Sequence, residues 1–422
     1  MKKSNRKGFT IVELVIVIAV IAILAAVLIP TFSNLIKKAN LSADQQAVRQ
    51  MNTLLATEEC ANISDAIKLF AANGLDLEAY KPITADHYFY FVNGRVILAD
   101  KDGNVLYPAG ANADGQWMSL SGEVPMDDSY TVADDGDVSI SSGAQFVHLM
   151  DTFASGGFTT ADVLNITITS DIDLKGSTIN FGKVDKNITL VSDGKVIAGL
   201  RADTNAFTGT HEGEDKSYGF ALFGSVEANT TVTVQNINFS NVIIQDTTDG
   251  QSGHAGLIAG SVYGELVVKN VTIDNCYVEG SDKGGIIAGY LSGEKARIEL
   301  ENVTVTNSIV AADWYVAKAV GAVSKTAVSI SITNCDFSGV TTMLRDEESS
   351  YEIEGRIVYT DEAGNKYLCC LGVTAGGVTN VAYSLTTNAN YWRSGLSDGS
   401  ITVSGNTYGT YLPMNDSWSS SN

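Results

Sequence analysis

The chain has 422 residues, enough for two or three domains, and a formal net charge of -21. Its 48 acidic residues against 27 basic ones argue against nucleic-acid binding and favour a soluble exported surface. The 5 cysteines and 4 histidines lack the spacing of a disulfide framework or a metal site, so we expect neither a metal nor a cofactor.

The N-terminus joins a short basic leader to an apolar helix. The leader ends at Gly8 and carries four cations that would stay on the cytoplasmic side of a membrane, Lys2, Lys3, Arg6 and Lys7. Every residue from Leu14 to Ile29 is apolar. An ordinary secretory signal is cut after its apolar region and discarded. Here the small Gly8 precedes the apolar run, so a cut there keeps the helix in the mature protein.

One carboxylate, Glu13, lies near the start of this apolar run, and the next basic residues along the helix are Lys37 and Lys38. An ionised carboxylate in hydrocarbon costs several kcal/mol unless it is neutralised. A cut after Gly8 creates a positive amine on Phe9. We expect Glu13 to pair with the Phe9 amine of a neighbouring subunit, which fixes the register between helices. The alternative is a plain signal anchor whose Glu13 reaches the membrane interface.

The segment Gly8-Phe9-Thr10 with Glu13 resembles the type IV prepilin leader, G-F-T-x-x-E. The resemblance implies that a prepilin peptidase cleaves between Gly8 and Phe9 and methylates the amine of Phe9. It implies that Glu13 acts in filament assembly with other pilin subunits and the pilus assembly machinery, and that Pro30 loosens the helix. It also implies a single-pass location in the inner (cytoplasmic) membrane, followed by an extracellular pilus or cell-surface location.

The apolar spacing predicts one helix from Phe9 to about Glu59, bent or loosened at Pro30. A shorter helix is predicted from Ser64, as N-cap, to Ala72, with Gly74 as a stop signal. We therefore assign residues 1–8 to a leader and residues 9–30 to a transmembrane or filament-core helix.

Three strands are predicted next, over residues 88–92, 95–99 and 104–107. The dipeptides Asn93-Gly94 and Asp102-Gly103 between them favour tight hairpin turns, so the strands should form an antiparallel meander. Packed on the amphipathic half of the helix, the meander would complete a small headgroup over residues 31–110. The run from Asp100 to Asn104 resembles half of a calcium loop but lacks the full spacing. A hairpin turn explains it better.

Four similar segments recur in the second half of the chain, and their leading asparagines are 34, 32 and 32 residues apart: Asn236, Asn270, Asn302 and Asn334. Apolar residues alternate with polar ones in the same columns of each copy. Stacked copies would bury these columns, which predicts a right-handed parallel β-helix (a solenoid) over residues 137–345. The asparagines should form a ladder, and Cys276 and Cys335 should be small buried residues.

The flanks of this repeat are less regular. Residues 111–136 are acidic and punctuated by glycine, which predicts a linker. A helix from Ala144 to Phe153 should cover the open end of the solenoid. Residues 346–422 form a β-rich C-terminal region with a hairpin around Gly364-Asn365.

The phrases at residues 256–260 and 285–289, GLIAG and GIIAG, resemble short repeats of bacterial surface adhesins. Together the features favour a non-catalytic type IV pilus subunit, a minor or tip pilin that presents its solenoid to a surface or glycan. Five aromatic residues are candidates for stacking on sugars, although covering turns or packing on the C-terminal region is the more ordinary role for each: Tyr263, Tyr277, Tyr290, Trp314 and Tyr315.

Two alternatives stay open. The chain is a major structural pilin or a secretion pseudopilin, or it is a pilus-tethered enzyme that acts on polysaccharides. The best local cluster for catalysis is Asp246, Asp249 and His254. It lacks the carboxylate series that β-helical glycosidases use, so we expect no catalytic residues.

Overall fold

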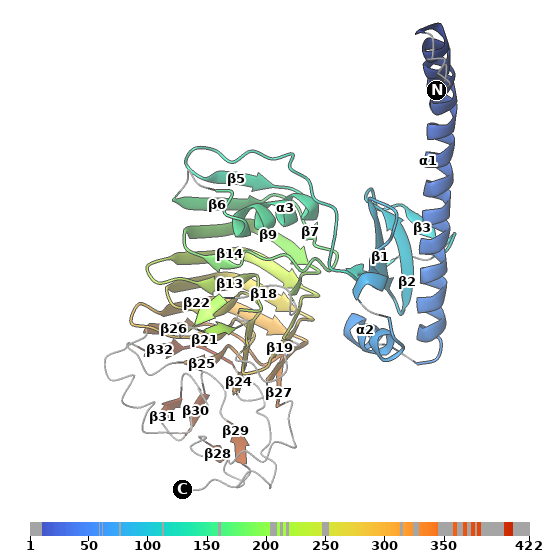
Figure 1. The fold of residues 1–422 in the computed structure, drawn as a ribbon. Helices are drawn as coiled ribbons and strands as arrows, with labels where there is room; N and C mark the ends of the chain where they lie inside the picture. Colours follow the sequence, from blue (N-terminus) through green and yellow to red (C-terminus); the bar gives the residue numbers. More distant parts are fainter. Residues whose placement is uncertain are drawn as a thin grey trace, which may run out of the picture. The chain divides into compact units, whose positions relative to one another are not determined.

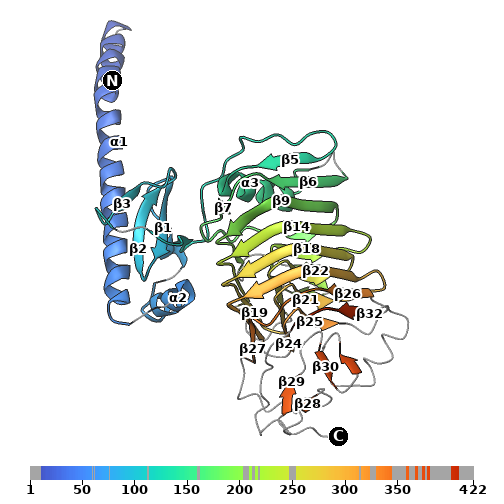
Figure 2. The ribbon, with the colours of Figure 1, turned by 180° about the vertical axis from the view of Figure 1, so that it is seen from behind.

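The computed structural model describes residues 11–58, 60, 62–75, 77–111, 114–158, 162–202, 209–211, 214–216, 219–246, 253–312, 315–323, 329–344, 358–360, 366–368, 373–375, 378–380 and 401–407. The chain divides into two compact units, Met1–Gly115 and Gln116–Asn422. The first contains a long helix and a small antiparallel sheet, and the second is built of stacked parallel strands (Figures 1 and 2).

The first unit is organised by helix α1, Ile11–Leu55, which confirms the predicted long helix. α1 continues as helix on both sides of Pro30, and loosening at that residue stays a prediction. Its C-terminal half packs on the sheet through Val48 and Met51, which are buried. Asn52 fixes this packing because its amide donates to the Val96 carbonyl at 2.8 Å and accepts from the Val96 N–H at 2.7 Å.

Helix α2, Ile63–Ala72, is capped by Asn62, whose side chain accepts a hydrogen bond from the Asp65 N–H at 3.0 Å. The predicted N-cap, Ser64, is therefore wrong: buried Ile63 already belongs to the helix, and the extended Asn62 before it supplies the cap. Gly74, with φ of +79°, follows the helix end as predicted. A short 3₁₀ turn, η1, covers Leu77–Tyr80.

The predicted meander is confirmed as β1 (His87–Val92), β2 (Arg95–Asp100) and β3 (Val105–Tyr107), paired antiparallel in that order. Asn93 and Gly94 both have positive φ, as the first hairpin turn requires. At the second turn the Asp100 carboxylate accepts from the Asn104 side chain and from the backbone N–H groups of Asn104 and Asp102. These bonds, led by that of the Asn104 side chain, lower the pKa of Asp100. The carboxylate thus closes a turn.

The second unit confirms the parallel β-solenoid (Figures 1 and 2). Its long sheet has the order β32-β26-β22-β18-β14-β9-β6-β5, and β7 pairs with β9. Their bounds are β5 Asp137–Ile140, β6 Val163–Ile168, β7 Ile172–Asp173, β9 Asn187–Ala198, β14 Thr231–Ser240, β18 Glu265–Asp274, β22 Arg297–Thr306, β26 Ser329–Thr333 and β32 Ile401–Ser404.

Three shorter parallel sheets complete each turn of the solenoid, which we call a rung. The second sheet contains β10 Arg201–Ala202, β15 Ile243–Gln245, β19 Tyr277–Gly280, β23 Ser308–Ala312 and β27 Val340–Leu344. The third contains β16 His254–Gly256, β20 Lys283–Gly285 and β24 Tyr315–Ala317. The fourth contains β8 Lys183–Val184, β13 Phe223–Val226, β17 Ala259–Val262, β21 Ala288–Leu291 and β25 Val320–Val323.

The remaining strands are short. β11 Gly209–His211 pairs with β12 Glu214–Lys216, β28 Val358–Thr360 with β29 Lys366–Leu368, and β30 Val373–Ala375 with β31 Val378–Asn380, all antiparallel. β28 and β29 flank the predicted hairpin, whose Gly364 and Asn365 lie outside the described residues. β4 is Met118–Ser119.

The solenoid core is formed by the apolar columns of the sequence repeat. All four positions one residue after the leading asparagines are buried, namely Ile237, Val271, Val303 and Cys335. Cys276 and Cys335 are free and buried, as predicted. Burial raises the pKa of the Cys276 thiol to about 12, so it stays protonated and behaves as a small apolar group.

Helix α3, Gly143–Ala154, lies at the β5 end of the solenoid and matches the predicted covering helix (Figure 1). Its N-cap is Ser142, whose hydroxyl accepts from the Gln145 N–H at 3.2 Å. Phe146 and Phe153 point into the core, where their ring centroids lie 5.7 and 5.5 Å from that of Phe181. This aromatic cluster closes the apolar interior against water.

Part of the segment predicted as a linker packs on the first rungs. Met118, Leu120 and Val124 are buried, and the Ser119 N–H donates to the Lys175 carbonyl at 2.8 Å. The buried Arg201 guanidinium donates to the carbonyl oxygens of Ser119 and Leu120. Residues 118–124 therefore belong to the body of the second unit.

Candidate functional site

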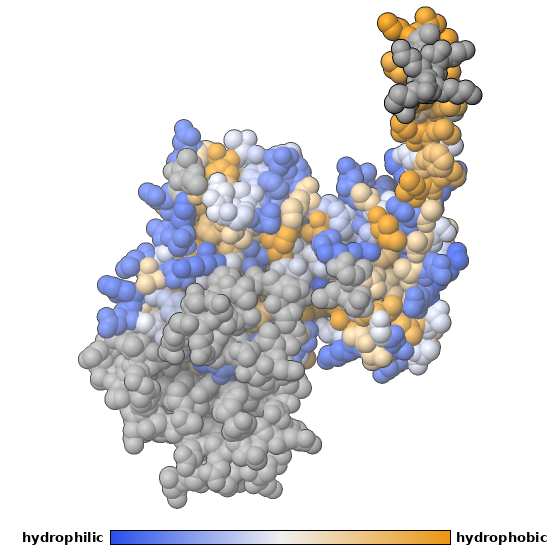
Figure 3. All heavy atoms as spheres, in the orientation of Figure 1, coloured by the Kyte–Doolittle hydropathy of each residue, from blue (hydrophilic) through white to orange (hydrophobic). Residues whose placement is uncertain are grey.

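The N-terminal half of α1 is an exposed apolar surface. Its large side chains are exposed by amounts that range from 82% at Ile11 to 46% at Leu28. Figure 3 colours most of the visible described residues of this segment as hydrophobic. Among the residues that the structure describes, this is the one helix long and apolar enough to cross a membrane, and its most apolar window is entirely unburied. Eighteen helical residues span about 27 Å, close to the thickness of a bilayer core.

Glu13 lies in the first described turn of α1 and is exposed on the helix surface. Gly8 and Phe9 lie outside the described residues, so cleavage, methylation and the pairing of Glu13 stay predictions. The structure does establish that the residues next to Glu13 turn their apolar side chains outward, where a bilayer or neighbouring helices can contact them.

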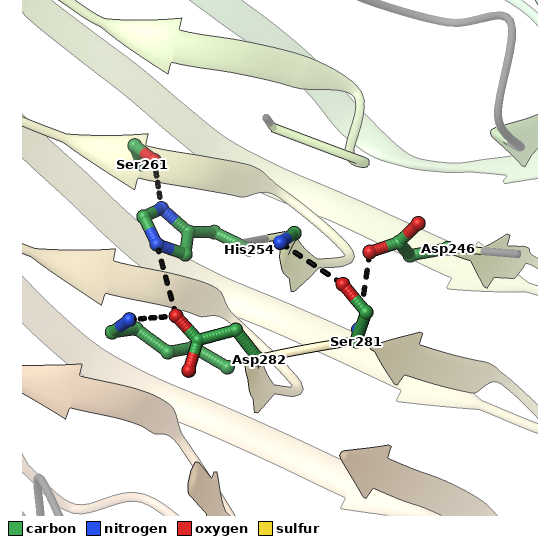
Figure 4. Close-up of polar contacts among 7 residues, drawn as sticks. Asp246, His254, Ser261, Ser281 and Asp282 are labelled. Carbon is green, nitrogen blue, oxygen red and sulfur yellow. Dashed lines mark hydrogen bonds and ion pairs between the residues drawn. The ribbon is translucent and has the colours of Figure 1, made fainter. Parts of the chain in front are cut away.

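A second candidate site is a polar cluster on the solenoid, formed by Asp246, His254, Ser261, Ser281, Asp282 and Lys283 (Figure 4). The ring atom Nδ1 of His254 lies 2.8 Å from Ser261 Oγ, and Nε2 lies 3.8 Å from Asp282 Oδ2. Lys283 contacts the same Asp282 carboxylate. The Asp246 carboxylate accepts from the Ser281 N–H at 3.1 Å, and Ser281 Oγ accepts from the Gly253 N–H at 3.0 Å.

The cluster has the residue types of a Ser-His-Asp hydrolase, but a substrate could not reach its serine and histidine side chains. Ser261 is 0% exposed and His254 is 3% exposed. Lys283 shares the carboxylate that would orient the histidine. The contacts join neighbouring rungs, so the geometry supports a structural role. Asp249 lies outside the described residues.

Sequence reasoning found Asp246 and His254 but missed Ser261, Ser281 and Asp282. Strand register brings these residues together, because His254 pairs with Lys283 and Ser261 pairs with Tyr290. Aligning the third and fourth sheets of successive rungs would have exposed the cluster, whereas the repeat of the long sheet alone does not.

Two of the candidate aromatic residues, Tyr277 and Tyr290, make contacts within the fold. The Tyr277 hydroxyl donates to Glu279 Oε2 at 2.8 Å. The centroid of the Tyr290 ring lies 4.8 Å from the centroid of the His254 ring. The same centroid lies 4.9 Å from Lys283 Nζ. Tyr263 is half-buried. The Trp314 residue and the Tyr315 side chain lie outside the described part of the chain.

The leading asparagines form a column on the outside of the bend in the long sheet. The Asn270 amide donates to Asn236 Oδ1 at 3.0 Å, and the Asn302 amide donates to Asn270 Oδ1 at 2.8 Å. Asn334 occupies the same position, and all four have φ between +52° and +56°. Asparagine tolerates this left-handed backbone better than other residues with a side chain. A parallel column, not foreseen from the sequence, joins Asn275 to Asn241 at 2.7 Å.

We expect Asn270→Ala to destabilise the solenoid by about 2 kcal/mol, since it loses two ladder bonds and places alanine at positive φ. Asn270→Gly should destabilise the solenoid by about half as much, because glycine adopts the left-handed backbone conformation without strain. Urea unfolding of the purified chain in detergent measures both. Equal losses in the two variants would contradict a conformational role for the asparagine.

Comparisons with known proteins agree with the N-terminal features. The family described as "Prokaryotic N-terminal methylation motif" matches residues 3–29. A type IV major fimbrial protein, FimA, of Dichelobacter nodosus is 46% identical over 55 residues, 13% of this chain and 35% of the relative. The type IV wide pilus major component PilA4 of Thermus thermophilus is 67% identical over 36 residues, 8% of this chain and 28% of the relative.

A third relative, the prepilin peptidase-dependent protein A of Clostridium perfringens, is 32% identical over 77 residues, 17% of this chain and 55% of the relative. The chain thus spans less than two thirds of each of these relatives. No solved structure matches. The N-terminal segment carries a prepilin-type methylation motif and is type IV pilin-like, and the β-solenoid follows it in the same chain.

Proposed function

We propose that this chain is a non-catalytic type IV pilus subunit, a minor or tip pilin that presents its solenoid for adhesion to a surface or glycan. The observation that carries the proposal is the unburied apolar half of α1, which follows a leader that ends at Gly8. Such a surface requires a bilayer first and neighbouring helices afterwards, as in a filament core.

Assembly would begin in the membrane, where α1 spans the bilayer once. Prepilin peptidase would cut after Gly8 and methylate the Phe9 amine. The Glu13 carboxylate of one subunit would then pair with the Phe9 amine of its neighbour. A buried ion pair contributes little net stability, but either charge left alone is strongly unfavourable. The pairing therefore selects one axial register as the assembly machinery adds subunits.

A minor or tip position is favoured by the size of the second unit. The second unit, residues 116–422, is much larger than the first unit of 115 residues. A second unit of this size on every subunit would crowd a helical array. The alternative is a major structural pilin or a pseudopilin. The number of copies per filament, measured in sheared and purified filaments, separates the two.

The solenoid supplies long flat outer faces, which solenoids use to bind partners. The burial of Ser261 and Asp246 speaks against catalysis by the polar cluster, because a substrate could not reach these side chains. Turnover of a polysaccharide by the purified chain would instead favour a pilus-tethered enzyme.

We expect a chain that ends at Gly115 to enter filaments as well as the full chain does, because it keeps α1, α2 and the meander of β1, β2 and β3. Attachment of cells to their surface or glycan should fall at least about tenfold, since each filament loses its binding domain. Immunoblots of sheared filaments and a cell-attachment assay measure the two effects.

Mass spectrometry should find methylated Phe9 as the first residue of both chains. Unchanged attachment would refute adhesion, and an intact leader would refute the pilin processing.

A further inference from the structure

The outermost strand of the long sheet comes from a distant part of the chain. β32 pairs in parallel with β26, with Ile401 beside Ile330 and Val403 beside Ile332. The asparagine bonds between earlier rungs join residues 32 or 34 apart. The bonds of Asn406 to the rung above join residues 71 and 74 apart. Residues 345–400 intervene, so the closing strand is connected to the solenoid by a long segment.

Residues 401–407 reproduce the repeat motif without its asparagine. Gly405 follows Ser404, the partner of Thr333, and so takes the place that Asn334 occupies in the rung above. Its φ of +67° matches the left-handed backbone of the asparagine column. A Cβ at Gly405 would lie 2.4 Å from Asn334 Oδ1, so a side chain there would require the Asn334 amide to move. Glycine thus allows this segment to stack on the last asparagine and ends the column.

The segment is held by main-chain contacts that any copy of it would make. Thr407 bonds to the solenoid in both directions, because its N–H donates to Cys335 O and its carbonyl accepts from the Phe337 N–H, each at 2.8 Å. The Asn406 side chain accepts from the Cys335 N–H and donates to the Ile332 carbonyl, both at 2.8 Å. Ile401 and Val403 are the register partners of buried Ile330 and Ile332.

We propose that the edge formed by β26 and residues 334–337 is a strand-acceptor site, and that a second copy of this chain can fill it with its own residues 401–407. The bonds are identical whether the strand comes from the same chain or from another. The two arrangements differ chiefly in the effective concentration of the strand, and the advantage of the strand from the same chain falls as the connecting segment lengthens. Exchange should therefore occur when copies are concentrated, and it joins their solenoids.

Paired cysteines test the exchange on the full chain, with Cys60, Cys369 and Cys370 replaced by serine. Ser331 and Thr402 are register partners on adjacent strands, which suits a disulfide. Ser331→Cys and Thr402→Cys in one chain should close a disulfide within the monomer. Two single variants, one Ser331→Cys and one Thr402→Cys, are then mixed, partly unfolded in urea and refolded together under oxidation.

The mixed single variants should give a disulfide-linked dimer at least about tenfold above a control that pairs Glu299→Cys with Thr402→Cys. Glu299 lies in the same column one rung away, on a strand paired on both sides. A closed disulfide in the double variant with no dimer above the control would overturn the exchange. An open disulfide in the folded double variant would overturn the strand pairing itself.

Discussion

Glu13→Ala should reduce incorporation into filaments by about a hundredfold or more while the protein still inserts in the membrane. Removing one partner of a buried ion pair leaves the other charge unpaired, at a cost of about 3–5 kcal/mol, and each 1.4 kcal/mol is a factor of ten. Membrane insertion depends on the apolar run from Leu14 to Ile29, which the substitution does not touch. Immunoblots of the sheared-filament and membrane fractions measure the two quantities.

Two variants separate the charge from other effects of the substitution. Glu13→Gln keeps the size of the side chain and should fail as Glu13→Ala does, because the pairing needs a negative charge. Glu58→Ala removes the same charge just beyond the end of α1, outside the apolar segment, and should assemble normally. Normal incorporation of Glu13→Ala would refute the pairing role.

Phe181→Ala should lower the free energy of unfolding of the second unit by about 3–5 kcal/mol. Phe181 is buried and lies between α3 and the core, with its ring centroid 4.9 Å from that of Phe223 in addition to its contacts with Phe146 and Phe153. Alanine would leave a cavity where the covering helix meets the first rungs. Denaturant unfolding, followed by intrinsic fluorescence, measures the loss.

Phe158→Ala is the matched control for this cluster. Phe158 is only half-buried, and its ring lies 6.3 Å from that of Phe153 at the edge of the same group. Phe158→Ala should lower the free energy of unfolding by less than half as much as Phe181→Ala, because water can fill the space left by the Phe158 ring. Equal losses would show that Phe181 does not form the centre of the closure.

Much of the fold was readable in local patterns. The apolar run with Glu13 and Gly8 predicted an exposed N-terminal helix, and the repeated columns around Asn236, Asn270 and Asn302 predicted the solenoid core. These patterns work because helices and strands have fixed periods, and because copies of one motif stack with their like residues aligned. Asparagine recurs at the bend because the backbone there is left-handed, a conformation that asparagine tolerates.

Other features became visible only in three dimensions. The choice of Asn62 over Ser64 as helix cap depends on the burial of Ile63, and the cluster around His254 depends on register between rungs.

The amino-acid sequence by itself determined the pilin-like N-terminal helix and the repeating core, because short-range periodicity and one-sided burial encode both. Only the tertiary structure decided that a distant segment, β32, closes the solenoid at the end opposite the predicted covering helix. The physical reason is that main-chain bonding is the same for many strands, so the partner of an edge is selected by long-range packing rather than by any local pattern.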